Sequence, residues 1–153
     1  MSTDRIERET LVNAPVERVW DVLTQAEHIG SWFCDAGADV DLRPGGSITL
    51  RWEQHGTAKC RLERVEPPHA LSWRWPANDA PDRHGDPAPG QSTLVEFTLE
   101  PVADGTRLRV VETGFDALAG RTDEQRERLH DGNVEGWEVQ LGRVAEYAQR
   151  ARV

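Results

Sequence analysis

The clearest hydrophobic pattern in the chain lies in its last stretch, from Thr122 to Ala151. One stripe of side chains recurs there at intervals of three and four residues, the spacing of one face of an α-helix: Leu129, Asn133, Trp137, Leu141, Val144 and Ala148. Thr122 is followed by three acidic or amide residues, a composition typical of a helix start. The pattern predicts one long C-terminal helix over Thr122–Ala151 with a single buried face.

Three glycines stand inside this predicted helix: Gly132, Gly136 and Gly142. Each disfavours a helix by about 1 kcal/mol relative to alanine, so each needs a structural reason. We expect either a close approach by another backbone or a bend. Because the chain has no second helical pattern of similar length, the buried stripe is expected to pack against a sheet.

The first part of the chain predicts a strand followed by two short helices. Arg5–Val12 is the candidate strand, and Pro15 stands near the start of the first helix. The apolar face of that helix follows the expected spacing through Val16, Val19, Trp20 and Leu23. A second short helix is expected over Ala26–Trp32.

From Asp39 onward the hydrophobic period changes to two, which is typical of strands. A brief strand over Asp39–Leu42 and a turn over Arg43–Gly46 come first. The alternating positions that follow are Ile48, Leu50 and Trp52; Ala58, Cys60 and Leu62; Leu71, Trp73 and Trp75; Val95, Phe97 and Leu99; and Leu108 and Val110. One long loop, Pro76–Gly90, interrupts them. The pattern predicts an antiparallel meander with one apolar and one charged face, closed by the long helix.

Composition narrows the functional classes. A net charge of −9 argues against binding to nucleic-acid phosphates or anionic membrane surfaces. Hydrophobic content is 37% and no apolar run reaches membrane-spanning length, so no membrane insertion is expected. The N-terminal sequence MSTDRIERET has no apolar core of a secretion signal, so a cytoplasmic location is expected. Cys34 and Cys60 lack a metal-like spacing and are expected to be buried free thiols.

A set of motifs in a fixed order resembles one known superfamily. The motifs are V-N-A-P-x-E-x-V-W-D-x-L-T over Val12–Thr24, Trp32-Phe33, Arg43-Pro44-Gly45-Gly46, Asp104-Gly105-Thr106-Arg107-Leu108 and Gly136-Trp137. Together they resemble the SRPBCC superfamily, which includes the START and Bet v types. Within it, the chain is similar to the C-terminal domain of the activator of the ninety-kilodalton heat-shock protein's ATPase.

The resemblance implies an α+β helix-grip fold in one domain over residues 1–153. This fold has two short helices after strand one and a curved seven-stranded antiparallel sheet around the long C-terminal helix, with a cavity between sheet and helix. Many relatives bind lipids, polyketides or other hydrophobic molecules, and some are cyclases or dehydratases. Two features depart from the pattern: Asn133, where relatives often carry histidine, and the long Pro76–Gly90 loop.

The meander also predicts where polar groups meet. Successive antiparallel strands end and begin at the same edge of a sheet, which brings Gln54, Trp75, Thr93 and Glu112 to one edge with inward-facing parity. The long helix starts just after Glu112, so His130 and Asn133 are expected near this edge, with Trp32 and Phe33 at its rim. An apolar groove with a few convergent polar groups at one mouth is typical of a ligand pocket.

The candidate ligand-binding residues are therefore Trp32, Phe33, Trp52, Gln54, Trp73, Trp75, Thr93, Phe97, Glu112, His130, Asn133 and Trp137. The tryptophans also fit a simpler role as core residues, and Glu112 also fits a bond to Asn133. The acidic residues and His84 of the long loop are expected to be solvated, and no metal or cofactor is expected. None of the nucleotide-binding, zinc-protease or serine-hydrolase motifs is present.

Three functions remain open from the sequence. The leading hypothesis is a module that binds a small hydrophobic molecule with one polar end. The enzymatic alternative is a cyclase or dehydratase in which Glu112 acts as acid or base. The third is a chaperone-associated module that binds a protein partner, although the predicted outer face of the sheet carries mixed charges. The sequence leaves the oligomeric state and the role of the Pro76–Gly90 loop open.

Overall fold

The predicted C-terminal helix is present as α3, which spans Asp123–Arg150 in the computed structural model. The Thr122 hydroxyl accepts a hydrogen bond from the Gln125 N–H, and the Gln125 side chain accepts one from the Thr122 N–H, which caps the helix start. The buried residues of α3 belong to the predicted stripe: Trp137, Leu141, Val144 and Ala148. The structure describes residues 4–54 and 56–150, so the predicted helix end at Ala151 lies outside the described residues.

The remaining elements follow the predicted order. They are β1 (Arg5–Val12), α1 (Val16–Thr24), α2 (Ala26–Trp32), β2 (Ala38–Val40), β3 (Ser47–Trp52), β4 (Gly56–Glu66), β5 (Ala70–Pro76), β6 (Ser92–Val102), β7 (Gly105–Thr113) and the short 3₁₀ helix η1 (Phe115–Ala117). The strands form one seven-stranded sheet in the order β1-β7-β6-β5-β4-β3-β2. All neighbouring strands pair antiparallel, so the chain has the predicted α+β helix-grip architecture.

One strand boundary differs from the prediction. The brief strand expected over Asp39–Leu42 is Ala38–Val40 in the structure. It ends early because the turn begins at Asp41, whose carbonyl accepts a hydrogen bond from the Arg43 N–H. The Arg43 carbonyl in turn accepts a hydrogen bond from the Gly46 N–H. The chain therefore turns at residues that the alternating sequence pattern assigned to the strand.

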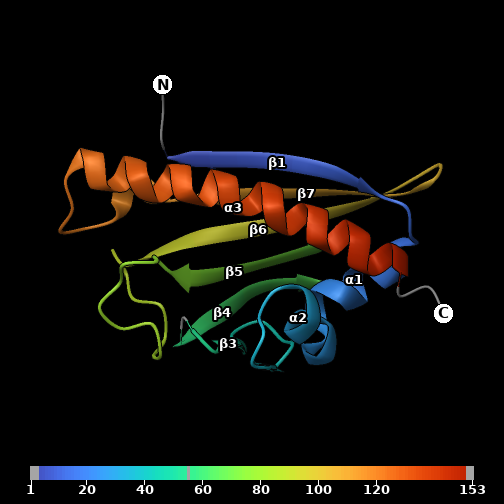
Figure 1. The fold of residues 1–153 in the computed structure, drawn as a ribbon, viewed down its shortest axis with the longest axis horizontal. Coiled ribbons are helices and arrows are strands. Elements are labelled where there is room, and N and C mark those ends of the chain that lie inside the picture. Colours follow the sequence, from blue (N-terminus) through green and yellow to red (C-terminus); the bar gives the residue numbers. More distant parts are fainter. Residues whose placement is uncertain (1–3, 55, 151–153) are drawn as a thin grey trace.

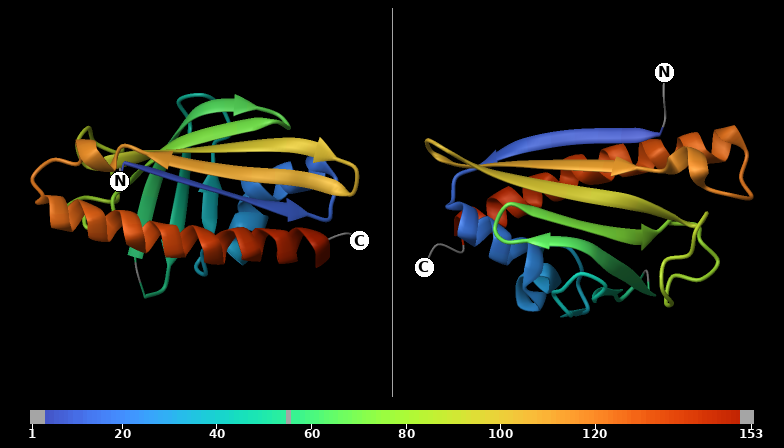
Figure 2. Two further views of the ribbon diagram at one scale, coloured as in Figure 1. Left: turned by 90° about the horizontal axis from the view of Figure 1, so that it is seen from above. Right: turned by 180° about the vertical axis from the view of Figure 1, so that it is seen from behind.

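The long helix covers one face of the curved sheet, and α1 and α2 pack near its C-terminal end on the same side (Figure 1). Figure 2 shows α3 running along β1, while the opposite end of the sheet, with β3 and β4, curls away from it. A register shift between Leu62 and Arg64 marks a bulge in β4, a feature that bends a strand. The curvature leaves room between α3 and the β3–β5 part of the sheet. None of the described helices is both long and apolar enough to cross a lipid bilayer.

The apolar face of α3 should contribute strongly to stability. Leu141 is 4% exposed within the core, whereas Val139 on the same helix is 55% exposed. We expect Leu141→Ala to lower the free energy of unfolding by about 2–5 kcal/mol, because a cavity forms in a packed core. Val139→Ala, the matched control, should change it by less than about 0.5 kcal/mol. Urea denaturation followed by circular dichroism measures both; equal effects would contradict the burial of this face.

Candidate ligand-binding site

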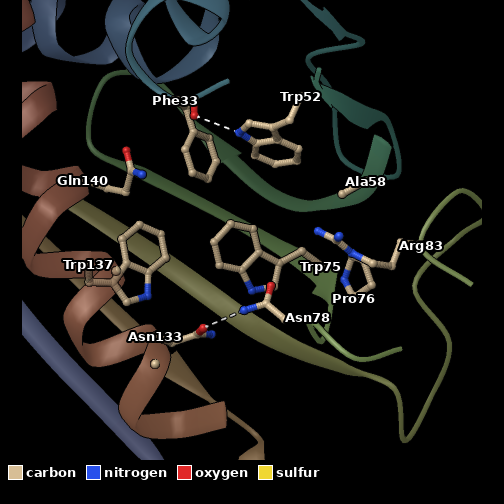
Figure 3. A pocket seen from close by; sticks show the side chains of 12 residues that line it. Phe33, Trp52, Ala58, Trp75, Pro76, Asn78, Arg83, Asn133, Trp137 and Gln140 are labelled. Atoms are coloured by element: carbon tan, nitrogen blue, oxygen red, sulfur yellow. Dashed lines mark hydrogen bonds between the residues drawn. The ribbon is translucent and has the colours of Figure 1, made fainter. Parts of the chain in front are cut away.

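A pocket of about 430 Å³ opens between α3, the ends of strands β3 and β5, the start of β4 and the loop after β5. Its wall consists of Phe33, Trp52, Ala58, Trp75, Pro76, Asn78, Arg83, Gly132, Asn133, Gly136, Trp137 and Gln140. Figure 3 shows these side chains converging on one space from the helix, the strand ends and the loop. A concave site with mainly apolar walls and a few polar groups is the usual form of a small-molecule site.

Aromatic rings form most of the pocket wall. The rings of Trp75 and Trp137 stack with their centroids 5.3 Å apart, and Phe33 lies 5.9 Å from both Trp75 and Trp52. The Trp52 indole N–H donates to the Phe33 carbonyl at 3.2 Å, which ties the end of β3 to the residue after α2. These contacts fix the ring positions and leave flat apolar faces around the space.

The helix side of the pocket is open because two of its residues are glycines. Gly132 and Gly136 both line the pocket, and a Cβ added at either would meet no atom within 4 Å from the described residues outside its own turn. Of the two reasons expected for the helix glycines, the close approach of another backbone is therefore wrong, and the bend stays a prediction. Gly132 and Gly136 instead leave empty volume where side chains would project into the pocket.

Glu112 lies behind this wall and is 0% exposed. Five hydrogen bonds reach its carboxylate: Trp75 Nε1 at 3.0 Å, Thr93 Oγ1 at 2.5 Å, Trp137 Nε1 at 2.8 Å, and Asn133 Nδ2 at 3.1 Å from each oxygen. Both oxygens therefore act as acceptors, which suits a buried carboxyl group. The donors come from β5, β6 and α3, so one side chain of β7 joins the sheet to the long helix.

A line of amides leads from the pocket surface to this carboxylate. Asn78 donates its side-chain N–H to the Asn133 side-chain oxygen at 3.4 Å, and Asn133 donates to Glu112. Figure 3 shows Asn78 and Asn133 facing each other at the pocket wall. Asn133 thus turns its donor inward and its acceptor toward the loop. Glu112 itself does not line the pocket.

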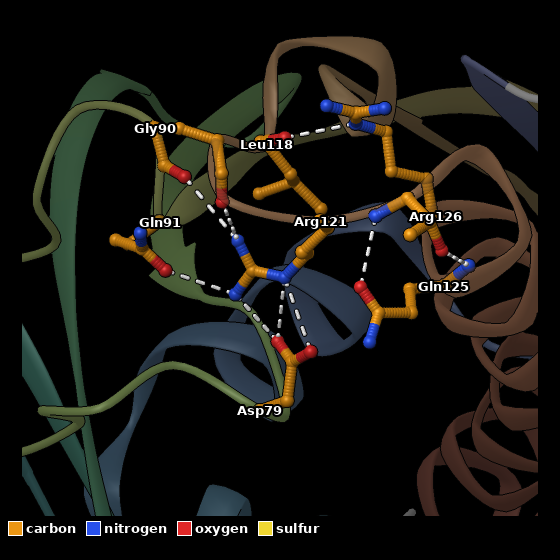
Figure 4. Close-up of polar contacts among 9 residues, drawn as sticks. Asp79, Gly90, Gln91, Leu118, Arg121, Gln125 and Arg126 are labelled. Atoms are coloured by element: carbon orange, nitrogen blue, oxygen red, sulfur yellow. Dashed lines mark hydrogen bonds and ion pairs between the residues drawn. The ribbon is translucent and has the colours of Figure 1, made fainter.

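The loop after β5 is held in place by Arg121, whose side chain is only 6% exposed (Figure 4). Its guanidinium binds both oxygens of Asp79, the Gln91 side chain and the Ala119 carbonyl. The hydrogen bonds from Arg121 hold the pKa of the Asp79 carboxyl below its ordinary value. The ion pair anchors the loop to the segment that precedes α3, and the loop forms one side of the pocket.

A comparison of the sequence with known families identifies the family of the chain. Residues 13–149 match the family model described as activator of Hsp90 ATPase homolog 1-like protein. The chain belongs to this family. The family is of the SRPBCC type, whose members commonly bind hydrophobic ligands. A search of curated proteins finds no match.

Solved structures share the architecture along 95–97% of the chain. Protein MLL2253 of Mesorhizobium loti is 25% identical, with a TM-score of 0.77 over 97% of this chain and 99% of that one. SA2116 of Staphylococcus aureus is 15% identical, with a TM-score of 0.77 over 96% and 94%. DynU16, a protein in the dynemicin biosynthetic locus, is 24% identical, with a TM-score of 0.70 over 95% of this chain and 47% of that one. The last two comparisons show the fold alone.

In this family member, several predicted site residues gather at the pocket. The sequence-predicted residues in its wall are Phe33, Trp52, Trp75, Asn133 and Trp137. Behind the wall lie Glu112, Thr93, Trp73, Phe97 and Trp32, which are buried and do not line it. Trp32, predicted at the rim, donates its indole N–H to the Val22 carbonyl at 2.7 Å instead.

Two predicted residues lie elsewhere. Gln54 is exposed in the turn after Trp52, where β3 has already ended, so the strand parity that placed it at the groove no longer applies. His130 donates its Nε2–H to the Arg5 carbonyl and lies edge-on to Phe115. It is one residue past Leu129 on α3, a rotation of about 100° on a helix, which turns it toward β1 rather than the pocket.

Other pocket residues were not identified from the sequence. Arg83 and Asn78 come from the Pro76–Gly90 loop, and Gln140 comes from α3. Gln140 was predictable in principle, since it lies seven residues after Asn133 on the same helical face. The position of Arg83 depends on a tertiary contact, the hydrogen bond from the Lys59 N–H to its carbonyl at 2.9 Å.

The described thiols and the acidic side chains of the loop do not form a reactive or metal-binding site. Cys34 and Cys60 are buried and free, and burial raises the pKa of both thiols. Within the described residues no cluster of three or more metal-ligating side chains occurs. The loop acids instead have protein partners: Asp79 pairs with Arg121, Asp82 accepts N–H groups of its own loop, and Asp86 pairs with Lys59.

The carboxylate of Glu112 should stabilise the fold through its donors. Glu112→Gln replaces one acceptor oxygen with an N–H₂ group that faces other donors, so we expect a loss of about 1–3 kcal/mol in unfolding free energy. Glu112→Leu leaves every donor unpaired and should lose more. Urea denaturation measures both. An unchanged stability of Glu112→Leu would contradict a structural role for this carboxylate.

Arg121→Met should release the loop. Trypsin cleaves after arginine, and we expect faster cleavage after Arg83 in this variant at neutral pH, because the Asp79 ion pair and the carbonyl contacts are gone. Arg128→Met, which removes an exposed arginine of α3, should leave this rate unchanged. Equal rates for wild type and Arg121→Met would show that Arg121 does not hold the loop.

The same anchor has a pH dependence with a defined sign. Because the folded pKa of Asp79 is depressed, the ion pair contributes stability above the ordinary aspartate pKa of about 3.9 and loses it as the pH falls through the lower folded value. Loop amides of the wild type should therefore become more mobile in ¹⁵N relaxation below about pH 4. In Asp79→Asn they should already be mobile at pH 6.

Proposed function

We propose that the protein binds a small hydrophobic molecule with one polar end in the pocket between α3 and the β3–β5 part of the sheet. The observation that carries the proposal is the aromatic pocket, whose volume of about 430 Å³ falls in the range of small-molecule sites. Membership of an SRPBCC-type family, in which hydrophobic ligands are common, supports it.

Two glycines of α3 in the pocket wall agree with the proposal. Gly132 and Gly136 each disfavour the helix by about 1 kcal/mol relative to alanine, yet no packing contact requires them within the described structure. Gly142 has equally open space around it but lies outside the pocket, so open space alone does not mark a pocket residue. Gly132 and Gly136 support the proposal because both line the pocket, where a larger side chain would take up its volume.

The contacts favour binding over catalysis by Glu112. A general acid or base must come within hydrogen-bond reach of the reacting atom. Glu112 is fully buried, does not line the pocket, and already accepts bonds from Trp75, Thr93, Asn133 and Trp137. We therefore assign it the role of fixing the pocket wall.

No observation favours a protein-binding surface. The exposed large hydrophobic side chains of the described residues, Leu11, Leu42 and Val139, belong to three different segments of the chain. Isolated apolar side chains of this kind are ordinary on protein surfaces. The outward face of the sheet carries ion pairs such as Arg107–Glu100 and Arg74–Glu63.

A pair of glycine variants tests the proposed site with the uncharged fluorescent probe N-phenyl-1-naphthylamine. We expect the wild type to bind the probe with increased fluorescence, and Gly136→Leu to weaken binding at least about tenfold, because the new side chain occupies the pocket. Gly142→Leu makes the same change at an exposed position of α3 outside the pocket and should bind like the wild type.

Both substitutions replace glycine with a strong helix former, so neither should destabilise the fold. The proposal would be wrong if the wild type did not bind the probe, or if the two variants bound it equally. If the wild type binds the probe and Gly136→Leu does not, mass spectrometry of small molecules that co-purify with the native protein would identify the natural ligand.

A further inference from the structure

One charged group in the pocket wall has no partner among the residues that the structure describes. Arg83 lines the pocket, and its Nε atom is buried without a hydrogen bond. No ion pair or side-chain hydrogen bond joins its guanidinium to any of the residues that the structure describes. Arg83 is half-buried, and its buried Nε atom has lost water without gaining an acceptor among the described residues, which is unfavourable.

The acidic neighbours of Arg83 are engaged elsewhere. Asp82 accepts backbone N–H groups of His84 and Gly85, and Asp86 forms an ion pair with Lys59 at 2.7 Å. Hydrogen bonds from these partners hold the pKa of both carboxyls below the ordinary value, so both stay ionised and bound to them. Asp79 pairs with Arg121.

Cys60 does not neutralise Arg83 either. The thiol is completely buried in the sheet next to the positive charge, and burial raises its pKa, so it remains uncharged. Glu112 is fully buried and accepts its bonds from Trp75, Thr93, Asn133 and Trp137. The positive charge of Arg83 is therefore available to a negatively charged group of a ligand in the pocket.

The backbone of Arg83 is positioned by the fold. Its carbonyl accepts the Lys59 N–H at the start of β4, and Arg121 fixes the loop on its other side. Figure 3 shows the Arg83 side chain extending from the loop toward Pro76, Ala58 and Trp75. The guanidinium therefore lies at the loop end of an aromatic space, across from Gln140.

We infer that the ligand of this pocket is an aromatic carboxylic acid whose carboxylate pairs with Arg83. This inference rests on the proposed function and specifies its ligand class. A guanidinium matches a carboxylate with two parallel hydrogen bonds. The ring faces of Phe33, Trp75 and Trp137 suit a flat aromatic body. At the far end, the buried and unpartnered Oε1 of Gln140 can accept a hydrogen bond from a ligand hydroxyl.

A carboxylate fits better than a phosphate. Arg83 is the one cationic side chain in the pocket wall among the described residues, and α3 contributes only residues from its middle, so no helix N-terminus points into the pocket. A doubly charged phosphate in a protein of net charge −9 would leave one charge uncompensated. One guanidinium neutralises one carboxylate.

The test compares naphthalene-2-carboxylate with naphthalene-2-carboxamide, which has the same shape without the charge. Titration calorimetry at pH 7 should show the wild type binding the acid about tenfold or more tightly than the amide. Arg83→Met should remove most of this preference and weaken amide binding far less, because the amide loses at most a neutral hydrogen bond whereas the acid loses its charge partner. Arg83→Lys should keep part of it, since the charge remains without the planar fork.

Arg61→Met is the control for net charge, because Arg61 alternates with inward-facing Cys60 and Leu62 on β4 and pairs with Glu63. It should bind both probes like the wild type. Equal binding of acid and amide by the wild type would overturn the inference while leaving the proposed function intact. The absence of binding by either probe would overturn both.

Three further results would also overturn the inference. An acid preference that persists in Arg83→Met would place the anion away from Arg83. If the wild type bound 2-naphthyl phosphate more tightly than the carboxylate, the ligand class would be an aromatic phosphate rather than a carboxylic acid. If Arg83→Met weakened amide binding as much as acid binding, Arg83 would shape the pocket rather than recognise charge.

Discussion

The structure depends on the burial of one carboxylate between the sheet and the long helix. A buried Glu112 is tolerable only if its acceptors are satisfied, and this requirement brings Trp75, Thr93, Asn133 and Trp137 to one point. Three elements distant in sequence must therefore meet in one register. The two tryptophans that meet this requirement also present their rings to the pocket, so the polar network and the apolar wall are two sides of the same residues.

The fold was predictable because its determinants are local. Alternation along β3–β7 and the three-to-four spacing of α3 give element type and inward face, and the parity of Leu108, Val110 and Glu112 correctly placed Glu112 inside. The same parity failed for Gln54, because β3 ends at Trp52 and a turn has no face. The prediction also failed for His130, because it lies on a different face of α3 from Asn133 and contacts β1 instead of the pocket.

The polar character of the pocket was less predictable. The sequence placed Glu112 among the ligand-binding residues, whereas the network that surrounds it keeps it behind Trp75, Asn133 and Trp137. Arg83 lies in a loop without periodicity, and its place depends on a backbone bond from Lys59 and on the Arg121–Asp79 pair. Contacts between segments far apart in sequence decide such positions, and no local pattern records them.

Two opposite charges near one pocket thus have different roles. The carboxyl oxygens of Glu112 accept hydrogen bonds from the protein's own donors, so this group fixes the wall and does not face the ligand space. Arg83 has no acceptor among the described residues, so its positive charge remains available at the surface of that space. In a protein with a net charge of −9, long-range electrostatics does not attract an anion. Selectivity for an anion then rests on the short-range contact with this single half-buried guanidinium, whose Nε atom is shielded from water.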